Sequence, residues 1–231
     1  MNALTFKLKP HLHIKPSGRI NCSRLTPDNL AHLSIDEIKN IKLIDKDPTK
    51  IADYFDVSGT QTSHIVFQNS TTQLEYIGHK MSFGQITVEG NCGDFLGAKM
   101  QGGTIICHGN AQDRVGDQMR RGLILIDGNA GEYCASRMVA GTIGVYGDVA
   151  RYVGFGMKRG TILLTKTPAL HATIADCGSY HLPFLALLVQ RFACFTSQFN
   201  HIKSFRVQRY AGDLACNGNG EILICKVDGF T

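Results

Sequence analysis

The sequence has no tryptophan, no pair of cysteines separated by two residues and no long uninterrupted apolar run. Its longest apolar segment, residues 182–195, contains Gln190 and Arg191 and is too short to span a bilayer, so we expect no membrane partner. Charged residues make up only 19% of the chain, and the net charge of +5 is too small to indicate nucleic-acid binding. With 231 residues, of which 43% are hydrophobic, the chain is expected to form one or two globular domains.

The cysteines do not follow a disulfide or zinc-binding pattern. There are eight of them, and most stand among apolar residues, where they replace Val, Ile or Ala. The N-terminus carries no secretion signal. We therefore expect reduced thiols and a cytoplasmic protein.

Signatures of common catalytic sites are also missing, since the chain has no HExxH, GxSxG or Walker sequence. His11 and His13 could share one face of a strand, but no third ligand accompanies them, and we predict no metal site. We interpret four aspartates as solvated turn residues that bond to the backbone. These are Asp113, Asp117, Asp127 and Asp148. No catalytic residue is predicted.

What the sequence has in excess is glycine, arranged in a 19-residue repeat. Of the 25 glycines, 17 lie between Met81 and Leu164. The later methionines are 19 residues apart, at Met81, Met100, Met119, Met138 and Met157. Isoleucines keep the same step, at Ile86, Ile105, Ile124, Ile143 and Ile162. Three glycine columns share this register, beginning at Gly78, Gly84 and Gly90, and together they indicate a tandem structural repeat.

The repeat is too short and too rich in glycine for helical architectures such as ankyrin or tetratricopeptide arrays. Ile105 and Cys107 are separated by one residue, as are their counterparts in other repeats, which predicts a strand with one face inward. Stacked coils would place equivalent side chains about 4.8 Å apart and bury a continuous core, with methionine as a flexible filler. The predicted fold is all-β, a right-handed parallel β-helix with one strand in each 19-residue coil.

The two ends of the chain lack the repeat. We divide the chain into an N-terminal α/β cap (residues 1–58), the β-helix (59–166) and a C-terminal helix and tail (167–231). A cap is expected because a bare end would expose an edge that templates further strands. Apolar residues at Phe184, Leu188 and Phe192 predict an amphipathic helix within residues 181–195. This helix either covers the far end of the β-helix or docks a partner.

We call the glycine-rich turns at which the chain of a coil changes direction its corners. Basic residues gather at two neighbouring corners of the predicted coils. Lys80, Lys99 and Arg137 share one repeat position. The next corner carries Arg120, Arg121, Lys158 and Arg159. Because charges on adjacent coils lie close together along the axis, an extended polyanion can contact several of them. The alternative is a solvated edge that keeps the protein in solution, where such charges add little stability.

The repeat G-x-x-M-x-x-G-x-I-x-x-x-G-x-A-G resembles the β-helix shared by the C subunit of formylmethanofuran dehydrogenase and the C-terminal domain of glutamate synthase. Residues 34–40 (SIDEIKN), 52–59 (ADYFDVSG) and 76–81 (YIGHKM) are similar to the lead-in and first coil of that C subunit. Residues 176–178, 184–188, 210–215 and 218–223 resemble the bacterial branch, the C subunit of the formyltransferase/hydrolase complex of methylotrophs. The resemblance covers nearly the whole chain.

The resemblance implies a four-subunit complex of one-carbon metabolism. It transfers a formyl group from formyl-tetrahydromethanopterin to a methanofuran-type carrier and releases formate. The implied partners are an amidohydrolase-like A subunit, a B subunit and a formyltransferase D subunit. In this family the catalytic residues lie in the amidohydrolase-like and formyltransferase subunits. This chain is therefore expected to be a non-catalytic scaffold with no cofactor of its own.

The family's carriers have glutamate-rich tails, which makes the basic corners candidate contacts. These candidates are Lys80, Lys99, Arg120, Arg121, Arg137, Lys158 and Arg159. Two alternatives stay open. The complex can be a molybdenum or tungsten formylmethanofuran dehydrogenase, because this chain has no ligands that decide between the two chemistries. A glutamate-synthase-like domain that acts as an enzyme on its own would need an active-site cluster, which the sequence does not offer.

Overall fold

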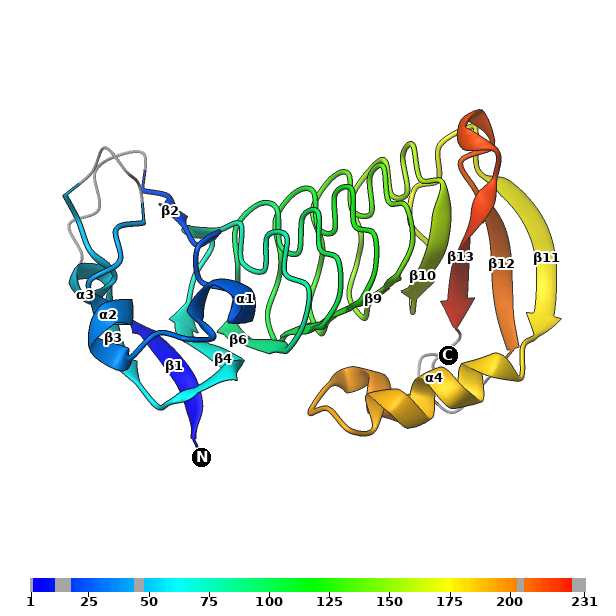
Figure 1. Ribbon diagram of the computed structural model, residues 1–231. Helices are drawn as coiled ribbons and strands as arrows, with labels where there is room; N and C mark the ends of the chain where they lie inside the picture. The colour runs from blue at the N-terminus through cyan, green and yellow to red at the C-terminus, as the bar shows by residue number, and fades with distance from the viewer. Residues whose placement is uncertain (1, 11–17, 44–47, 203–205, 226–231) are drawn as a thin grey trace.

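A computed structural model describes residues 2–10, 18–43, 48–202 and 206–225. One sheet of 11 strands runs through the molecule, in the order β11-β12-β13-β10-β9-β8-β7-β6-β4-β1-β3 (Figure 1). In chain order its strands are β1 (Ala3–Leu8), β3 (Phe55–Ser58), β4 (Gln61–Ser70), β6 (Gln85–Gly90), β7 (Thr104–Cys107), β8 (Leu123–Ile126), β9 (Thr142–Val145), β10 (Arg159–Leu164), β11 (Ala175–His181), β12 (Arg206–Gly212) and β13 (Asn219–Cys225). The predicted sheet-dominated class is confirmed.

The remaining elements are short. The strands β2 (Ile20–Asn21) and β5 (Leu74–Glu75) form a second, two-stranded sheet. The helices are α1 (Pro27–Leu30), α2 (Ile35–Lys39), α3 (Ile51–Tyr54) and α4 (Phe184–Phe192), with 3-10 turns η1 (Gln198–His201) and η2 (Leu214–Cys216). Of the helices in the described ranges, none has the length and apolar character needed to cross a membrane.

The 19-residue repeat corresponds to a stack of coils. Strands β6 to β10 pair in parallel, and each isoleucine of the repeat lies directly opposite the next, from Ile86 through Ile105 to Ile162. A second line of contact on each coil is a single parallel bridge, as between Cys92 and Ala111. Figure 1 shows the coils lying side by side between the two ends of the chain. Five isoleucines and five methionines of the repeat are fully buried, so they form the continuous core.

The glycine columns exist because the core packs against the corner backbone. A Cβ atom on Gly97 would lie 2.3 Å from Cδ1 of Ile124, and one on Gly103 would lie 2.5 Å from Cε of Met81. Both distances are far shorter than atoms tolerate. The methionines of the repeat and the isoleucines at Ile105, Ile124 and Ile143 therefore each require a glycine beside them.

The two ends extend the same sheet. At the N-terminal end, β1 lies between β3 and β4, pairing antiparallel with the first and parallel with the second. Ser34 caps α2 and exchanges hydrogen bonds with Glu37, as a capping box does. At the other end, β13 pairs in parallel with β10, and β12 and β11 follow as antiparallel strands.

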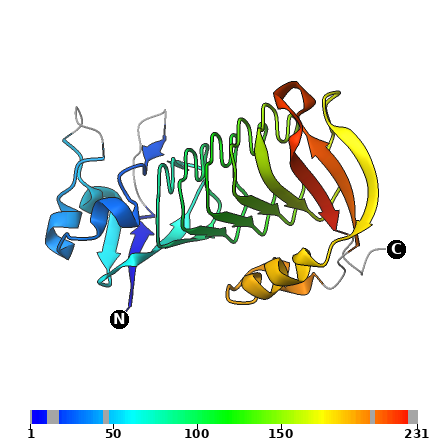
Figure 2. The same ribbon diagram turned by 45° about the vertical axis from the view of Figure 1, so that its right-hand side comes forward.

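The C-terminal helix covers the outer face of the sheet and not the end of the stack. Helix α4 is shorter than the predicted segment, because His181 belongs to β11. Leu185 and Phe192 of α4 pack in a second apolar cluster with Leu125 and Leu163 of the strands. Figure 2 shows α4 lying beside the sheet, while β11, β12 and β13 extend the stack. At the far end of the stack it is the strand β13, and not the helix, that pairs with β10.

Candidate anion-binding groove

A groove of about 760 Å³ runs across the corners of successive coils. Its lining residues are Lys80, Lys99, Gln101, Gln118, Arg120, Arg137, Val139, Gly156, Lys158 and Cys216. A second groove of about 450 Å³ adjoins it and is lined by Val139, Lys158, Arg159, Ala215, Cys216, Asn217 and Asn219. Six of the seven predicted basic residues thus line two adjoining grooves, and Arg121 lines neither of them.

The backbone places these side chains in line. The N–H of Lys80 donates to the carbonyl of Ala98 on the next coil, at 3.0 Å. Lys99 donates in the same way to Asp117 at 2.7 Å, and Arg137 to Phe155 at 2.7 Å. Because the same hydrogen bond recurs once per coil, equivalent side chains follow one another along the stack.

Most of the positive charge in the groove is uncompensated. Lys80, Lys99, Arg120 and Lys158 are exposed, and no acidic side chain in the described ranges forms an ion pair with them. Burial, together with the charges of Lys80 and Lys99, lowers the pKa of His79 below its usual value. The groove therefore favours anions.

Arg137 differs from the other cations of the groove, because it is paired with Asp117. Its Nη2 lies 2.8 Å from Oδ2 of that carboxylate, and its Nε lies 3.0 Å from Oδ1. Sequence reasoning missed Asp117 as part of the groove. The residues at its repeat position are Ala98 and Ser136, so no column marks it.

The four aspartates interpreted as solvated turn residues separate into two pairs. Asp113 and Asp148 are exposed, as predicted. For Asp117 and Asp127 the prediction is wrong, because Asp117 is 3% exposed and the side chain of Asp127 is 9% exposed. Each of these two carboxylates is covered by the hydrogen-bond donors that surround it, which replace water as its partners.

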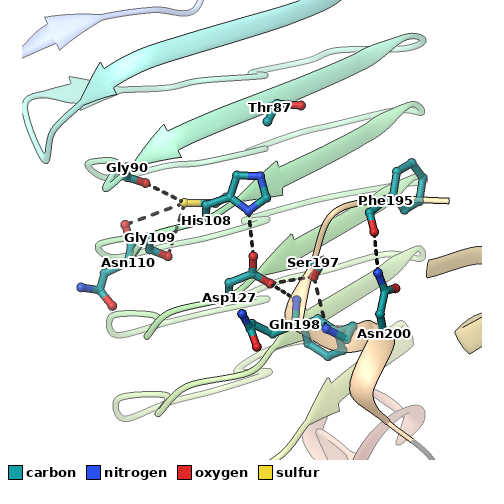
Figure 3. A network of polar contacts seen from close by, with 12 residues as sticks. Thr87, Gly90, His108, Gly109, Asn110, Asp127, Phe195, Ser197, Gln198 and Asn200 are labelled. Carbon is teal, nitrogen blue, oxygen red and sulfur yellow. Dashed lines mark hydrogen bonds and ion pairs between the residues drawn. The ribbon is translucent and has the colours of Figure 1, made fainter. Parts of the chain in front are cut away.

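Asp127 is the centre of a polar cluster outside the groove (Figure 3). His108 Nδ1 lies 2.8 Å from its Oδ2, while the Ser197 hydroxyl and the Gln198 N–H donate to its Oδ1 at 2.6 and 2.8 Å. In a Ser-His-Asp triad the imidazole lies between the hydroxyl and the carboxylate. Here the carboxylate lies between the other two groups, so Ser197 donates to an acceptor that orients it and not to the histidine base. The cluster joins the segment after α4 to the end of β8.

The cysteines of the described chain are all free. Cys92 and Cys107 lie in the core with their sulfur atoms 3.8 Å apart. Burial raises the pKa of the Cys134 thiol to about 12. Within the part of the chain that the structure describes, no three His, Cys, Asp or Glu side chains are grouped to hold a metal ion. The pair His11 and His13 lies outside the described residues.

No family model matches the chain. Several known proteins are similar to it in sequence. The C subunit of tungsten-containing formylmethanofuran dehydrogenase 2 from Methanococcus maripaludis is 30% identical over 99 residues, which are 42% of this chain and 35% of that protein. The protein of the same name from Methanothermobacter marburgensis is 34% identical over 83 residues, 33% of this chain and 31% of that protein. The matches thus span about a third of the length of these curated relatives.

A solved structure matches nearly the whole chain. It is a chain in the crystal structure of the formyltransferase/hydrolase complex (FhcABCD) from Methylorubrum extorquens, in complex with methylofuran. The likeness covers 96% of this chain and 99% of that chain, with a TM-score of 0.67 and 27% identity. Sequence and structure therefore agree, and they confirm the resemblance to the C subunits of formylmethanofuran dehydrogenase and of the formyltransferase/hydrolase complex.

Proposed function

We propose that this chain is the C subunit of a formyltransferase/hydrolase complex, in which it is a non-catalytic scaffold. The complex transfers a formyl group from formyl-tetrahydromethanopterin to a methanofuran-type carrier and releases it as formate. The observation that carries the proposal is the match to a chain of FhcABCD over 96% of this chain and 99% of that one, which includes both non-repeating ends. The partners are the amidohydrolase-like A subunit, the B subunit and the formyltransferase D subunit.

The architecture that we propose for this role is a right-handed parallel β-helix over residues 59–166. Residues 1–58 form its cap, and residues 167–231 close it or dock a partner. The parallel register of β4 and β6 to β10 supports this description. A rigid stack of this kind holds the surfaces at its two ends at a fixed separation, as a scaffold requires.

The groove is proposed to contact the anionic, glutamate-rich tail of the carrier, which is bound at the level of the complex. Lys80, Lys99, Arg120 and Lys158 support this assignment, because they line the groove and form no ion pair with an acidic side chain in the described part of the chain. Arg137, Arg159 and Arg121 complete the proposed set. The order of groups around Asp127 supports the non-catalytic role, since the hydroxyl of Ser197 has a carboxylate and not a histidine as its acceptor.

Co-expression with the three partner subunits tests the proposal. We expect the four chains to elute together on a sizing column, and formyl transfer and hydrolysis to require the assembled complex. The isolated chain should show no turnover of formyl-tetrahydromethanopterin. Separate elution of this chain, or turnover by the chain alone, contradicts the proposal.

A second candidate is the C subunit of a tungsten formylmethanofuran dehydrogenase, which the names of the curated relatives favour. The scaffold role is the same, but the partner subunits would hold metal. Elemental analysis of the purified complex separates the two functions, because tungsten or molybdenum together with iron–sulfur clusters is expected only for the dehydrogenase.

A further inference from the structure

Asp117 is buried beside the groove and accepts hydrogen bonds from Gln118 and Arg137, two of the side chains that line it. We call the column that contains Lys80, Lys99, Gln118 and Arg137 the wall of the groove. The pair with Arg137 is bidentate and uses Nε and Nη2, at 2.8 to 3.0 Å. Nε2 of Gln118 donates to Oδ2 of the same carboxylate at 3.0 Å. The hydroxyl of Ser136, on the same coil as Arg137, donates to Oδ1 at 2.7 Å and anchors the carboxylate. A single buried group therefore fixes the middle of the groove.

The residues of this wall also carry backbone strain. Lys80, Lys99, Gln118 and Arg137 have φ between 52° and 59°, the left-handed region. The next residue of the column is Gly156, at φ 71°, which is the residue type that this conformation favours. L-residues are disfavoured in this region, and strain of this kind clusters at binding sites. The long polar side chains of the wall are thus present despite an unfavourable backbone.

Charge alone does not account for Asp117. A site that attracts anions by its net charge is weakened by a carboxylate under its wall, because that carboxylate neutralises Arg137. What the carboxylate provides is geometry. It engages one edge of the guanidinium and leaves Nη1 without a partner in the described part of the chain, on a side chain that is 53% exposed. An arginine held in this way presents fixed, planar N–H donors, which match a carboxylate better than a mobile cation does.

We propose that Asp117 is a positioning residue that orders the groove for anions which accept a planar pair of N–H donors. Through Arg137 and Gln118 it orders the donors in the middle of an extended site whose ends are the exposed Lys80 and Lys158. From Lys80 to Lys158 the site spans four coil steps of about 4.8 Å, or about 19 Å, which is the length of about six extended residues. The ligand class is therefore an oligocarboxylate that lies along the stack. This inference rests on the proposed contact between the groove and an anionic tail.

The test is the affinity of the full chain for hexa-L-glutamate and for tripolyphosphate, measured by titration calorimetry. Asp117→Asn keeps the size of the side chain but removes one negative charge. If charge alone governs binding, this variant binds both anions more tightly. If Asp117 positions Arg137, both anions bind more weakly, by about tenfold for hexaglutamate, because the guanidinium fork fits carboxylate and phosphate alike. The matched control is Asp113→Asn, which makes the same charge change at an exposed aspartate that lines neither groove.

A second variant covers the case in which Asp117→Asn does not fold, as judged by thermal unfolding. Arg137→Lys keeps the charge at an exposed position and removes the bidentate pair, and it should lose hexaglutamate affinity by a similar factor. If a folded Asp117→Asn or Arg137→Lys binds hexaglutamate as tightly as the unaltered chain, or more tightly, the inference about Asp117 is overturned. The assignment of the groove is not affected by that result. Failure of the unaltered chain to bind hexaglutamate in low salt overturns the groove assignment as well, while assembly with the three partner subunits still reports on the scaffold role.

Discussion

The corner residues carry both the backbone strain and the proposed binding surface. In each coil three alternate positions have positive φ, as at Tyr76, Gly78 and Lys80 of the first coil, besides the glycine column that begins at Gly84. The middle position is glycine, or Ala135 in one coil, because the core leaves little room for a side chain. The outer two positions are exposed or half-buried and hold large side chains. Their residue types are therefore set by the surface and not by the fold.

Lys99→Gly tests this separation of stability from binding. Lys99 has φ 57° and no ion-pair partner in the described ranges, so glycine relieves the left-handed strain without removing a contact. The relief of backbone strain is larger than the entropy that the more flexible glycine loses on folding. We therefore expect the free energy of unfolding to rise by about 0.5–1 kcal/mol. Urea unfolding measures this change.

The same variant should bind hexaglutamate more weakly, because a cation is lost from the groove. The control is Lys99→Gln, which loses the charge but keeps the strain, and so should lose affinity without gaining stability. A Lys99→Gly variant that is less stable than the unaltered chain contradicts this account.

The sequence predicts the cations of the groove but not its carboxylate. Lys80, Lys99 and Arg137 recur at one position, and their alignment follows directly from the period of 19. Asp117 occurs once, next to Gln118, and an aspartate near a corner has a strong preference for solvated turns. Its burial depends on Ser136 and Arg137 of the following coil, which is a tertiary arrangement that no local pattern encodes.

Among the elements, the docking of α4 and η1 depends on a glycine in the middle of a strand. Residues of β8 alternate between the two faces, with Ile124 in the coil core and Leu125 in the cluster under α4. Gly144 of β9 leaves a hollow beside Leu125. The ring of Phe199 from η1 fills this hollow, since a Cβ atom on Gly144 would lie 2.7 Å from its Cζ.

Gly144→Ala should displace η1 and loosen the C-terminal segment. Overpacking of this kind costs about 1–3 kcal/mol of unfolding free energy. The double variant Gly144→Ala with Phe199→Leu provides room for the new methyl group and should recover part of the loss. Urea unfolding of the unaltered protein, of each single variant and of the double variant measures this coupling. Limited proteolysis reports on the C-terminal segment. Strictly additive effects would show that the two residues do not share the hollow.

The corner hydrogen bonds of the stack end at η2. The N–H of Gly156 has no further coil to bond to, and it donates to Oδ2 of Asp213 at 2.6 Å. Burial on its own would raise the pKa of Asp213. Hydrogen bonds from Gly156, Thr173 and Ala215, together with the charge of His171, outweigh burial and lower the pKa below its ordinary value. Asp213 thus caps the last coil in its ionised form.

This cap makes stability depend on pH in a defined direction. Because the folded-state pKa is lower than the unfolded value of about 3.9, the contribution of Asp213 is complete above about pH 5 and is lost as the pH falls through the folded-state pKa. Asp213→Asn should be less stable at pH 7 and should lose less stability than the unaltered chain between pH 5 and pH 3. Urea unfolding across this range measures the difference. Parallel pH profiles for the two chains contradict the assignment.

The end elements are less predictable than the coils for a physical reason. The helix predicted within residues 181–195 exists as α4, but β11 takes His181, and the strands that extend the sheet carry little periodic signal. Most of β11 is exposed or half-buried, so its sequence lacks the alternation that marks a strand. Its structure comes from pairing with β12, a contact between residues 25 to 36 positions apart in the chain.

At the scale of the whole molecule, one period determines most of the structure. A repeat of 19 residues with fixed glycine, methionine and isoleucine positions specifies the coil, the core and the alignment of surface residues in one step. The ends have no repeat, and their likeness to a known complex rests on short segments such as residues 52–59 and 210–215. The match over 96% of the chain and 99% of the other chain includes both ends, so the ends are part of the likeness to that chain of FhcABCD.

Because the coils repeat, the length of the stack can change only by whole coils. Adding or removing one unit of 19 residues changes the separation of the two terminal surfaces by about 4.8 Å and leaves every remaining contact in place. Whatever chains bind those surfaces are held apart by a distance that evolution can adjust by whole units, without redesigning either contact.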